Sequence, residues 1–194
     1  MGIRATIATM IASSLVAMAT AQEGTTMSMD FSDQAVAAQW QAVNDGVMGG
    51  KSSGGPAWSG DHMTFSGIIN TDGGGFSSIR APMAPGSLAD ASTLKLRVKT
   101  DGRAFRLMFR TNVKRWGMRV SFQAPIPAGS PGEWTDVEIP LTGLESSFHG
   151  RPVDADFDKS DVRSIGIIIA DGQDGPFEMS IASIDKVLTR QAAS

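Results

Sequence analysis

The sequence predicts an all-β protein built as an antiparallel β-sandwich, because apolar and polar residues alternate along most of the chain and helix-forming segments are scarce. Two neighbouring segments show the alternation most clearly. Leu94, Leu96 and Val98 alternate with Lys95, Arg97 and Lys99, and Phe105, Leu107 and Phe109 alternate with Arg106, Met108 and Arg110. Successive side chains of a strand point to opposite faces, so each segment has one apolar face and one largely charged face.

Further segments follow the same rule, and together they predict about nine or ten short strands in one domain. They are Met63 to Ile68, Met118 to Phe122, Val137 to Leu141, and Phe177 to Ile181 continuing towards Val187. Ser164 to Ala170 is apolar on both faces and is predicted to be a central strand covered on each side. Thr100-Asp101-Gly102-Arg103 predicts a tight β-hairpin between the two segments described first.

Helix is expected only in two short stretches. Ser32 is a candidate cap for a turn or two over residues 34–39, and residues 141–148 could form another short helix. Among the tryptophans, Trp40 and Trp134 are predicted to fill the core, whereas Trp58 and Trp116 lie in polar surroundings and are predicted to be exposed.

The N-terminal segment has the features of a secretory signal peptide. Arg4 supplies a positive charge, residues 7–18 form a short apolar run, and Ala19-Thr20-Ala21 fits a signal peptidase site. A membrane anchor is the alternative, but the run is too short and too interrupted by Ser and Thr for a span. We therefore expect cleavage after residue 21, a single domain over residues 22–194, and an exported, periplasmic protein without a later transmembrane segment.

Composition excludes several classes of function. The chain has a formal net charge of −3, and removing Arg4 with the signal peptide makes the domain more acidic, so nucleic acid and anionic lipid are disfavoured partners. There is no cysteine in the sequence, which rules out disulfides, thiolate nucleophiles and sulfur-ligated zinc. No metal or cofactor is expected.

The stretch N-D-G-V-M-G-G-K-S, residues 44–52, resembles two catalytic motifs but has the context of neither. A phosphate-binding P-loop would need glycine where Asp45 stands, and a helix after Ser52, whereas Ser-Gly-Gly-Pro follows. Residues 50–54 match the nucleophile elbow G-x-S-x-G, but that elbow joins a parallel strand to a helix. Neither a nucleotide site nor a serine nucleophile is therefore expected.

Together with the four residues before it, from Trp40, this stretch resembles the W-x-x-V-N-D-G-V-M-G-G-x-S signature of the complex I intermediate-associated protein 30 family. A second block, Gly73 to Arg80, is similar to that family's G-G-F-[AS]-S-[IV]-R element, and weaker correspondences continue to Phe177. The resemblance implies a β-sandwich of the galactose-binding-domain-like, jelly-roll type. It also implies an assembly factor without catalysis, because mitochondrial relatives hold partly built respiratory complex I in the matrix.

The two glycine-rich blocks are the candidate binding loops. Their residues are Asn44, Asp45, Gly46, Met48, Gly49, Gly50, Ser52, Gly74, Gly75, Phe76 and Arg80. The favoured interpretation is structural, with turns and close backbone approaches that glycine, Asn and Asp permit. The alternative is that the two loops meet at one end of the sandwich and present Asp45, Arg80 and backbone N–H groups to a partner.

Three other features have plain explanations. Residues 170–175 could lend oxygens to calcium but lack a complete calcium loop, so a turn is expected. Glu138 and Glu178 are expected to be solvated rather than paired for glycosidase chemistry. Arg106, Arg110, Lys114, Arg115 and Arg119 form a basic sector that is best explained as a solvated sheet face, although an acidic protein partner would also suit it.

These observations favour a non-catalytic, chaperone-like or assembly-factor-like domain that binds a protein, with respiratory complex subunits as candidate partners. A carbohydrate-binding module of an exported protein is the alternative, supported by fold analogy alone. The complete absence of tyrosine counts against a sugar site, because tyrosine combines a stacking surface with a hydroxyl. An enzyme is the least favoured class, since no catalytic constellation stands out.

Overall fold

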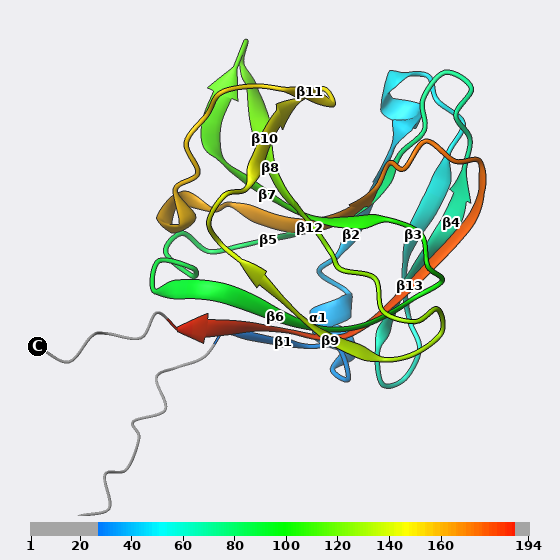
Figure 1. The fold of residues 1–194 in the computed structure, drawn as a ribbon, viewed down its shortest axis with the longest axis horizontal. Coiled ribbons are helices and arrows are strands. Elements are labelled where there is room, and N and C mark those ends of the chain that lie inside the picture. The colour runs from blue at the N-terminus through cyan, green and yellow to red at the C-terminus, as the bar shows by residue number, and fades with distance from the viewer. Residues whose placement is uncertain (1–26, 189–194) are drawn as a thin grey trace, which may run out of the picture.

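The computed structural model describes residues 27–188, which form two antiparallel sheets packed face to face (Figure 1). The sandwich predicted from alternation is therefore confirmed. The predicted signal peptide lies outside the described residues. Within residues 27–188, no helix is long and apolar enough to span a bilayer.

Sheet A has six strands. Its order is β3 (Ser53–Trp58), β4 (Met63–Ile69), β13 (Gly175–Leu188), β6 (Ala91–Thr100) and β9 (Thr135–Pro140), with β1 (Ser28–Asp30) paired to β13.

Sheet B has seven strands. Its order is β11 (Arg151–Pro152), β10 (Glu145–Phe148), β8 (Met118–Pro125), β7 (Phe105–Arg115), β12 (Ser164–Ile169), β5 (Ser77–Pro82) and β2 (Gln41–Asn44). One α-helix, α1 (Gln34–Ala37), and two 3₁₀ turns, η1 (Asp45–Met48) and η2 (Lys159–Asp161), complete the described elements.

The core lies between the inner faces of the two sheets and is rich in aromatic side chains. Phe65 of β4 and Phe177 of β13 come from sheet A, and Phe105 of β7 comes from sheet B. Their ring centroids lie 4.9 to 6.2 Å apart in edge-to-face arrangements. Such pairs are favourable beyond the area they bury, so this triad ties the two sheets together.

The Asp-Gly turn does not form the predicted hairpin. Although residues 101–104 connect β6 to β7 directly, β6 belongs to sheet A and β7 to sheet B. The Asp101 carboxylate accepts hydrogen bonds from the backbone N–H groups of Arg103 and Glu178, at 3.0 and 2.8 Å. These bonds hold the chain in a corner that crosses between the sheets, which a local turn pattern does not distinguish from a hairpin.

The helix predictions were only partly right. The first helix is shorter than expected, and Asp33 rather than Ser32 caps it by accepting a hydrogen bond from the N–H of Ala35. Residues 145–148 form strand β10 instead of a helix, because they pair with β8 at the edge of sheet B.

The tryptophan predictions were right for three of the four residues. Trp40 is buried against Phe31, and Trp58 and Trp116 are exposed. Trp134 is only half-buried and does not belong to the core. Its ring is perpendicular to that of His62, and the ammonium of Lys99 lies over it.

Candidate functional site

A buried carboxylate joins the two glycine-rich blocks at one end of the sandwich. Asp45, at the start of η1, is completely buried. Its two oxygens accept hydrogen bonds from the N–H and hydroxyl of Ser52, at 2.9 and 2.6 Å, and from the N–H groups of Gly75 and Phe76, at 2.6 and 3.3 Å. We call these four residues the Asp45 knot.

Glycine is required beside this carboxylate because no side chain would fit. A Cβ atom added to Gly50 would lie 2.2 Å from Cγ of Asp45, and one added to Gly74 would lie 2.3 Å from Oδ2. Both approaches are far closer than nonbonded atoms allow. Gly49 serves a different purpose, since its φ of 88° is left-handed and ends η1.

Burial alone would raise the pKa of Asp45, but the hydrogen bonds from Ser52, Gly75 and Phe76 outweigh it and lower the pKa. The group is therefore a stable carboxylate at neutral pH. Four donors of the fold satisfy its two oxygens, as expected for a structural anion rather than for a proton-transfer group.

Asn44 extends the knot to both sheets. Its side-chain amide donates to the carbonyl of Gly54 on β3, at 3.0 Å, and its carbonyl oxygen accepts from the hydroxyl of Ser77 on β5, at 2.6 Å. The structure thus supports the turn interpretation of the first block.

The predicted site residues divide into two groups. All of them except Arg80 gather around the knot, where Gly46, Met48 and Gly49 are exposed. The neighbouring Val47, which the sequence did not single out, is 74% exposed and Met48 is 56% exposed. Arg80 lies apart, on the outer face of sheet B. That these loops bind a partner stays a prediction.

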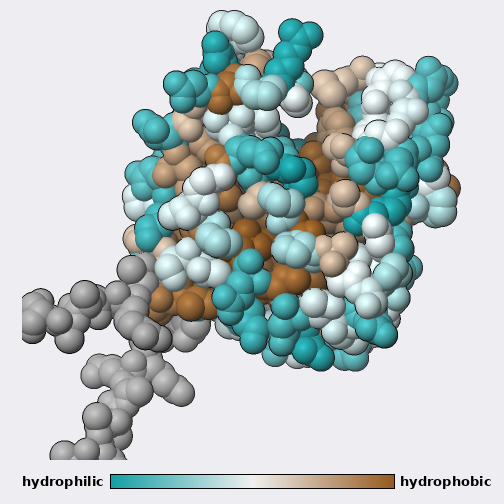
Figure 2. All heavy atoms as spheres, viewed as in Figure 1, coloured by the Kyte–Doolittle hydropathy of each residue, from teal (hydrophilic) through white to brown (hydrophobic). Residues whose placement is uncertain are grey.

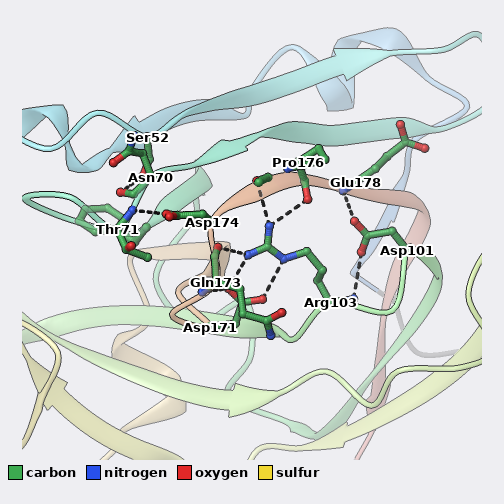
Figure 3. A network of polar contacts seen from close by, with 12 residues as sticks. Ser52, Asn70, Thr71, Asp101, Arg103, Asp171, Gln173, Asp174, Pro176 and Glu178 are labelled. Carbon is green, nitrogen blue, oxygen red and sulfur yellow. Dashed lines mark hydrogen bonds and ion pairs between the residues drawn. The ribbon is translucent and has the colours of Figure 1, made fainter.

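A second polar network holds the corner between the sheets and was not anticipated (Figure 3). The guanidinium of Arg103 makes two hydrogen bonds to the carboxylate of Asp171, at 2.6 and 2.9 Å, and donates to the carbonyls of Gln173, Gly175 and Pro176. The turn predicted for residues 170–175 is present, and Asp171 is committed to Arg103. Each of the two turns contains an Asp-Gly pair, but no local pattern in the sequence predicts that Arg103 and Asp171 meet.

The outer face of sheet B carries a concentration of arginine that depends on strand register. Arg80 on β5 lies opposite Gly166 on β12, which in turn lies opposite Met108 on β7. Because Gly166 has no side chain, the side chains of Arg80 and Met108 extend over β12 from either side. A Cβ atom added to Gly166 would lie 2.9 Å from Cγ of Arg80 and 3.1 Å from Cε of Met108. Two residues along β7, Arg110 points to the same face.

The Nε atoms of Arg80 and Arg110 are buried and have no hydrogen-bond partner among the described residues. Burial, and secondarily the charge of Arg110, lowers the pKa of Arg80 to about 10. Burial, followed by the charge of Arg119, lowers the pKa of Arg110. These are the effects expected of cations close together without a nearby anion.

This face forms the floor of a hollow. In Figure 1, strands β8, β10 and β11 rise on one side of β12, and β2 with η1 rises on the other. The space-filling view shows the molecule hollowed between these two ends (Figure 2). The pockets lined by Trp40 and Trp58, and by Thr100 and Glu178, lie away from this floor.

The comparisons with known proteins agree with this architecture. Residues 29–181 match the family described as complex I intermediate-associated protein 30, and the chain belongs to that family. No curated protein sequence matches the chain.

Among solved structures, the fold is similar to that of a family 11 carbohydrate-binding module from Clostridium thermocellum in complex with a β-1,3-1,4-mixed-linked tetrasaccharide. The TM-score is 0.58 and the identity 18%, over 78% of this chain and 91% of the module. A second structure of a family 11 module, from the cellulosomal cellulase Lic26A-Cel5E of the same organism, gives a TM-score of 0.59 at 17% identity, over 79% of this chain and 91% of the module. At these identities the likeness concerns the fold.

Proposed function

We propose that this protein is a non-catalytic, assembly-factor-like domain that binds a protein partner across the hollow of sheet B. The observation that carries the proposal is the exposed pair Val47 and Met48, on a loop held by the buried Asp45 knot. Exposed apolar side chains on an anchored loop suit a protein contact, because the loop loses little conformational freedom on binding.

The opposite rim of the hollow offers a matching contact. At the turn between β7 and β8, Trp116 is 80% exposed and Met118 is 50% exposed. Tryptophan is enriched among residues that dominate binding energy, and methionine adapts to irregular apolar surfaces. A partner that spans the hollow would bury apolar side chains at both ends.

A binding role without catalysis also accounts for the polar groups of the knot. Asp45 and Ser52, the best placed base and nucleophile in the glycine-rich blocks, are bonded to each other and to the backbone inside the fold. Membership of the family makes respiratory complex subunits the first candidate partners. We propose the periplasm as the place of this encounter, because the N-terminal sequence has the features of a signal peptide.

Photocrosslinking tests the proposal directly. We would place benzoylphenylalanine at position 48 or 116 in cells that make the protein, with position 138 on the exposed side of β9 as control. We expect a discrete protein adduct from positions 48 and 116 and none from position 138. Absence of adducts at both rims, or equal labelling at all three positions, would contradict a protein site in the hollow.

Carbohydrate binding remains the alternative function, and the fold likeness is what supports it. The central strands offer no aromatic platform on the hollow's floor, since the side chains there include Ser78, Arg80, Met108, Ser121 and Gln123. A glycan array read by tryptophan fluorescence would decide, because binding of a neutral oligosaccharide would favour the alternative.

A further inference from the structure

Three arginines on the outer face of sheet B, Arg80, Arg110 and Arg119, differ from the ion-paired arginines of the protein in lacking a carboxylate. Arg103, Arg106 and Arg163 form ion pairs with Asp171, Glu145 and Asp161, at 2.5 to 2.6 Å. Within residues 27–188, Arg80, Arg110 and Arg119 take part in no ion pair.

Their surroundings make this lack unfavourable for the folded protein. Arg80 and Arg110 are half-buried, their Nε atoms are shielded from water, and each feels the repulsion of another arginine. Such a guanidinium is partly desolvated and has no opposite charge beside it, which costs free energy. An ordinary solvated sheet face, as expected from the alternation, would leave these groups in water.

The packing around Arg80 holds it in this position. Its stem lies over Gly166 beside Met108, and its Nη2 donates to the hydroxyl of Ser78 at 3.1 Å, which itself donates to the carbonyl of Val43 at 2.8 Å. The guanidinium is therefore oriented before any ligand arrives. Preorganised guanidinium groups bind carboxylates well, because their planar donors match two oxygens at once.

We propose that Arg80 and Arg110 bind the carboxylates of an acidic protein segment that lies in the hollow of sheet B. The inference rests on the proposed protein-binding function and adds the chemistry of the partner. The segment supplies the missing negative charge to the floor, while apolar residues beside its acids contact Met48 at one rim and Trp116 at the other.

Two features favour a protein over an acidic polysaccharide as the occupant. Met108 lies on the floor of the hollow and Met48 is exposed at one rim, and thioether side chains suit apolar residues of varied shape. Sugar rings instead prefer aromatic faces, and the four central strands present none on this floor.

Stability measurements provide the first test. We would replace Arg80 and Arg110 with Gln, singly and together. Arg97→Gln, on the outer face of sheet A, would serve as a control that removes the same charge at another place. Because the two hollow arginines lack an anion, we expect an unchanged or higher melting temperature for both single variants. In the native protein, Nε of Arg110 has no hydrogen-bond partner to lose. A clearly lower melting temperature for Arg110→Gln would therefore overturn the view that the charge of Arg110 is uncompensated.

Binding provides the second test. Short random peptides displayed on phage would be selected on the purified full chain, and the selected peptides measured by calorimetry at two salt concentrations. We expect enrichment in Asp and Glu, weaker binding at high salt, and at least about tenfold weaker binding to the double Gln variant. Arg97→Gln should change the affinity by less than about twofold, as befits a remote surface charge.

The outcomes separate this inference from the function on which it rests. Selected peptides that are neutral, or that bind the double Gln variant as well as the native protein, would overturn the acidic partner and leave the protein-binding function standing. Failure to select any peptide, together with binding of oligogalacturonate that depends on Arg80 and Arg110, would overturn both.

Discussion

Asp45 shows how one buried side chain can determine the conformation of two distant loops. Replacing it with Asn would keep the shape but turn an amide donor towards N–H groups that need an acceptor. We expect Asp45→Asn to lower the free energy of unfolding by about 2–4 kcal/mol, since bonds to a charged group are lost and buried donors are left unpaired. Urea denaturation followed by circular dichroism would measure the loss.

The pH dependence of stability provides an independent check on the same residue. Because the folded state lowers the pKa of Asp45 below that of an ordinary aspartate, the carboxylate stabilises the fold fully at any pH above that ordinary pKa. This contribution disappears as the pH falls through the lower folded pKa. The Asn variant should therefore lose less stability on acidification than the native protein does. If the free energy of unfolding fell equally with decreasing pH in the two proteins, Asp45 would not be the anion of the knot.

The glycines around the carboxylate allow a matched comparison. Gly50→Ala would place a Cβ 2.2 Å from Cγ of Asp45, whereas Gly46→Ala meets nothing within 4 Å. We expect a loss of about 2–4 kcal/mol for the first substitution, as for other overpacked or strained sites, and under about 1 kcal/mol for the second. Equal melting temperatures for the two variants would contradict the steric role assigned to Gly50.

At the scale of elements, the corner between β6 and β7 depends on Arg103. Asp171 is almost completely buried, with 3% of its side chain exposed, so removing the guanidinium would strand a carboxylate in the fold. We expect Arg103→Met to destabilise the protein by about 3–5 kcal/mol, the usual range when one partner of a buried pair is lost.

A double-mutant cycle would isolate this pair. Arg103→Met combined with Asp171→Asn should cost clearly less than the sum of the two single changes, because the second substitution removes the stranded charge. Arg103→Lys should not restore stability, since an ammonium cannot reproduce the paired bonds to Asp171 together with those to the carbonyls of residues 173, 175 and 176. Additive losses would mean that the two side chains act separately.

For the whole molecule, the phenylalanine triad is one direct link between the two sheets. Phe177→Ala would open a cavity against Phe65 and Phe105 and should cost about 3–5 kcal/mol. Val187→Ala, at a position 39% exposed near the end of β13, should change stability by less than about 0.5 kcal/mol. The midpoints of urea denaturation would report both changes in stability, provided that the dependence of the unfolding free energy on urea concentration is the same in all variants.

Local patterns predicted those parts of the molecule that depend on local geometry. Alternation along residues 94–98 and 105–109 identified their buried faces, because the side-chain period of a strand is the same in any sheet. It did not reveal that these two strands belong to different sheets. That outcome depends on Glu178 and Asp171, which lie more than sixty residues beyond the corner they hold.

The candidate site divides in the same way. The residue types of the glycine-rich blocks pointed to turns and close approaches, and the knot contains both. The hydrogen bond from Gly75 to Asp45, however, joins residues 30 positions apart, and no local rule supplies that pairing. Nor could the basic sector alone identify its unpaired members, since Arg106 lies beside Glu145 and Arg110 does not.

From the order of its amino acids alone, this protein could be recognised as a β-sandwich and as a member of its family, because inward and outward positions repeat along each strand and the glycine-rich blocks are distinctive. Which side chains meet across the sheets was decided only by folding. Strand order and register place Arg80 beside Gly166 and Met108, and bury Asp45 among donors from two loops. Charge and space at those positions depend on neighbours far away in the chain, so the hollow and its chemistry emerge only in three dimensions.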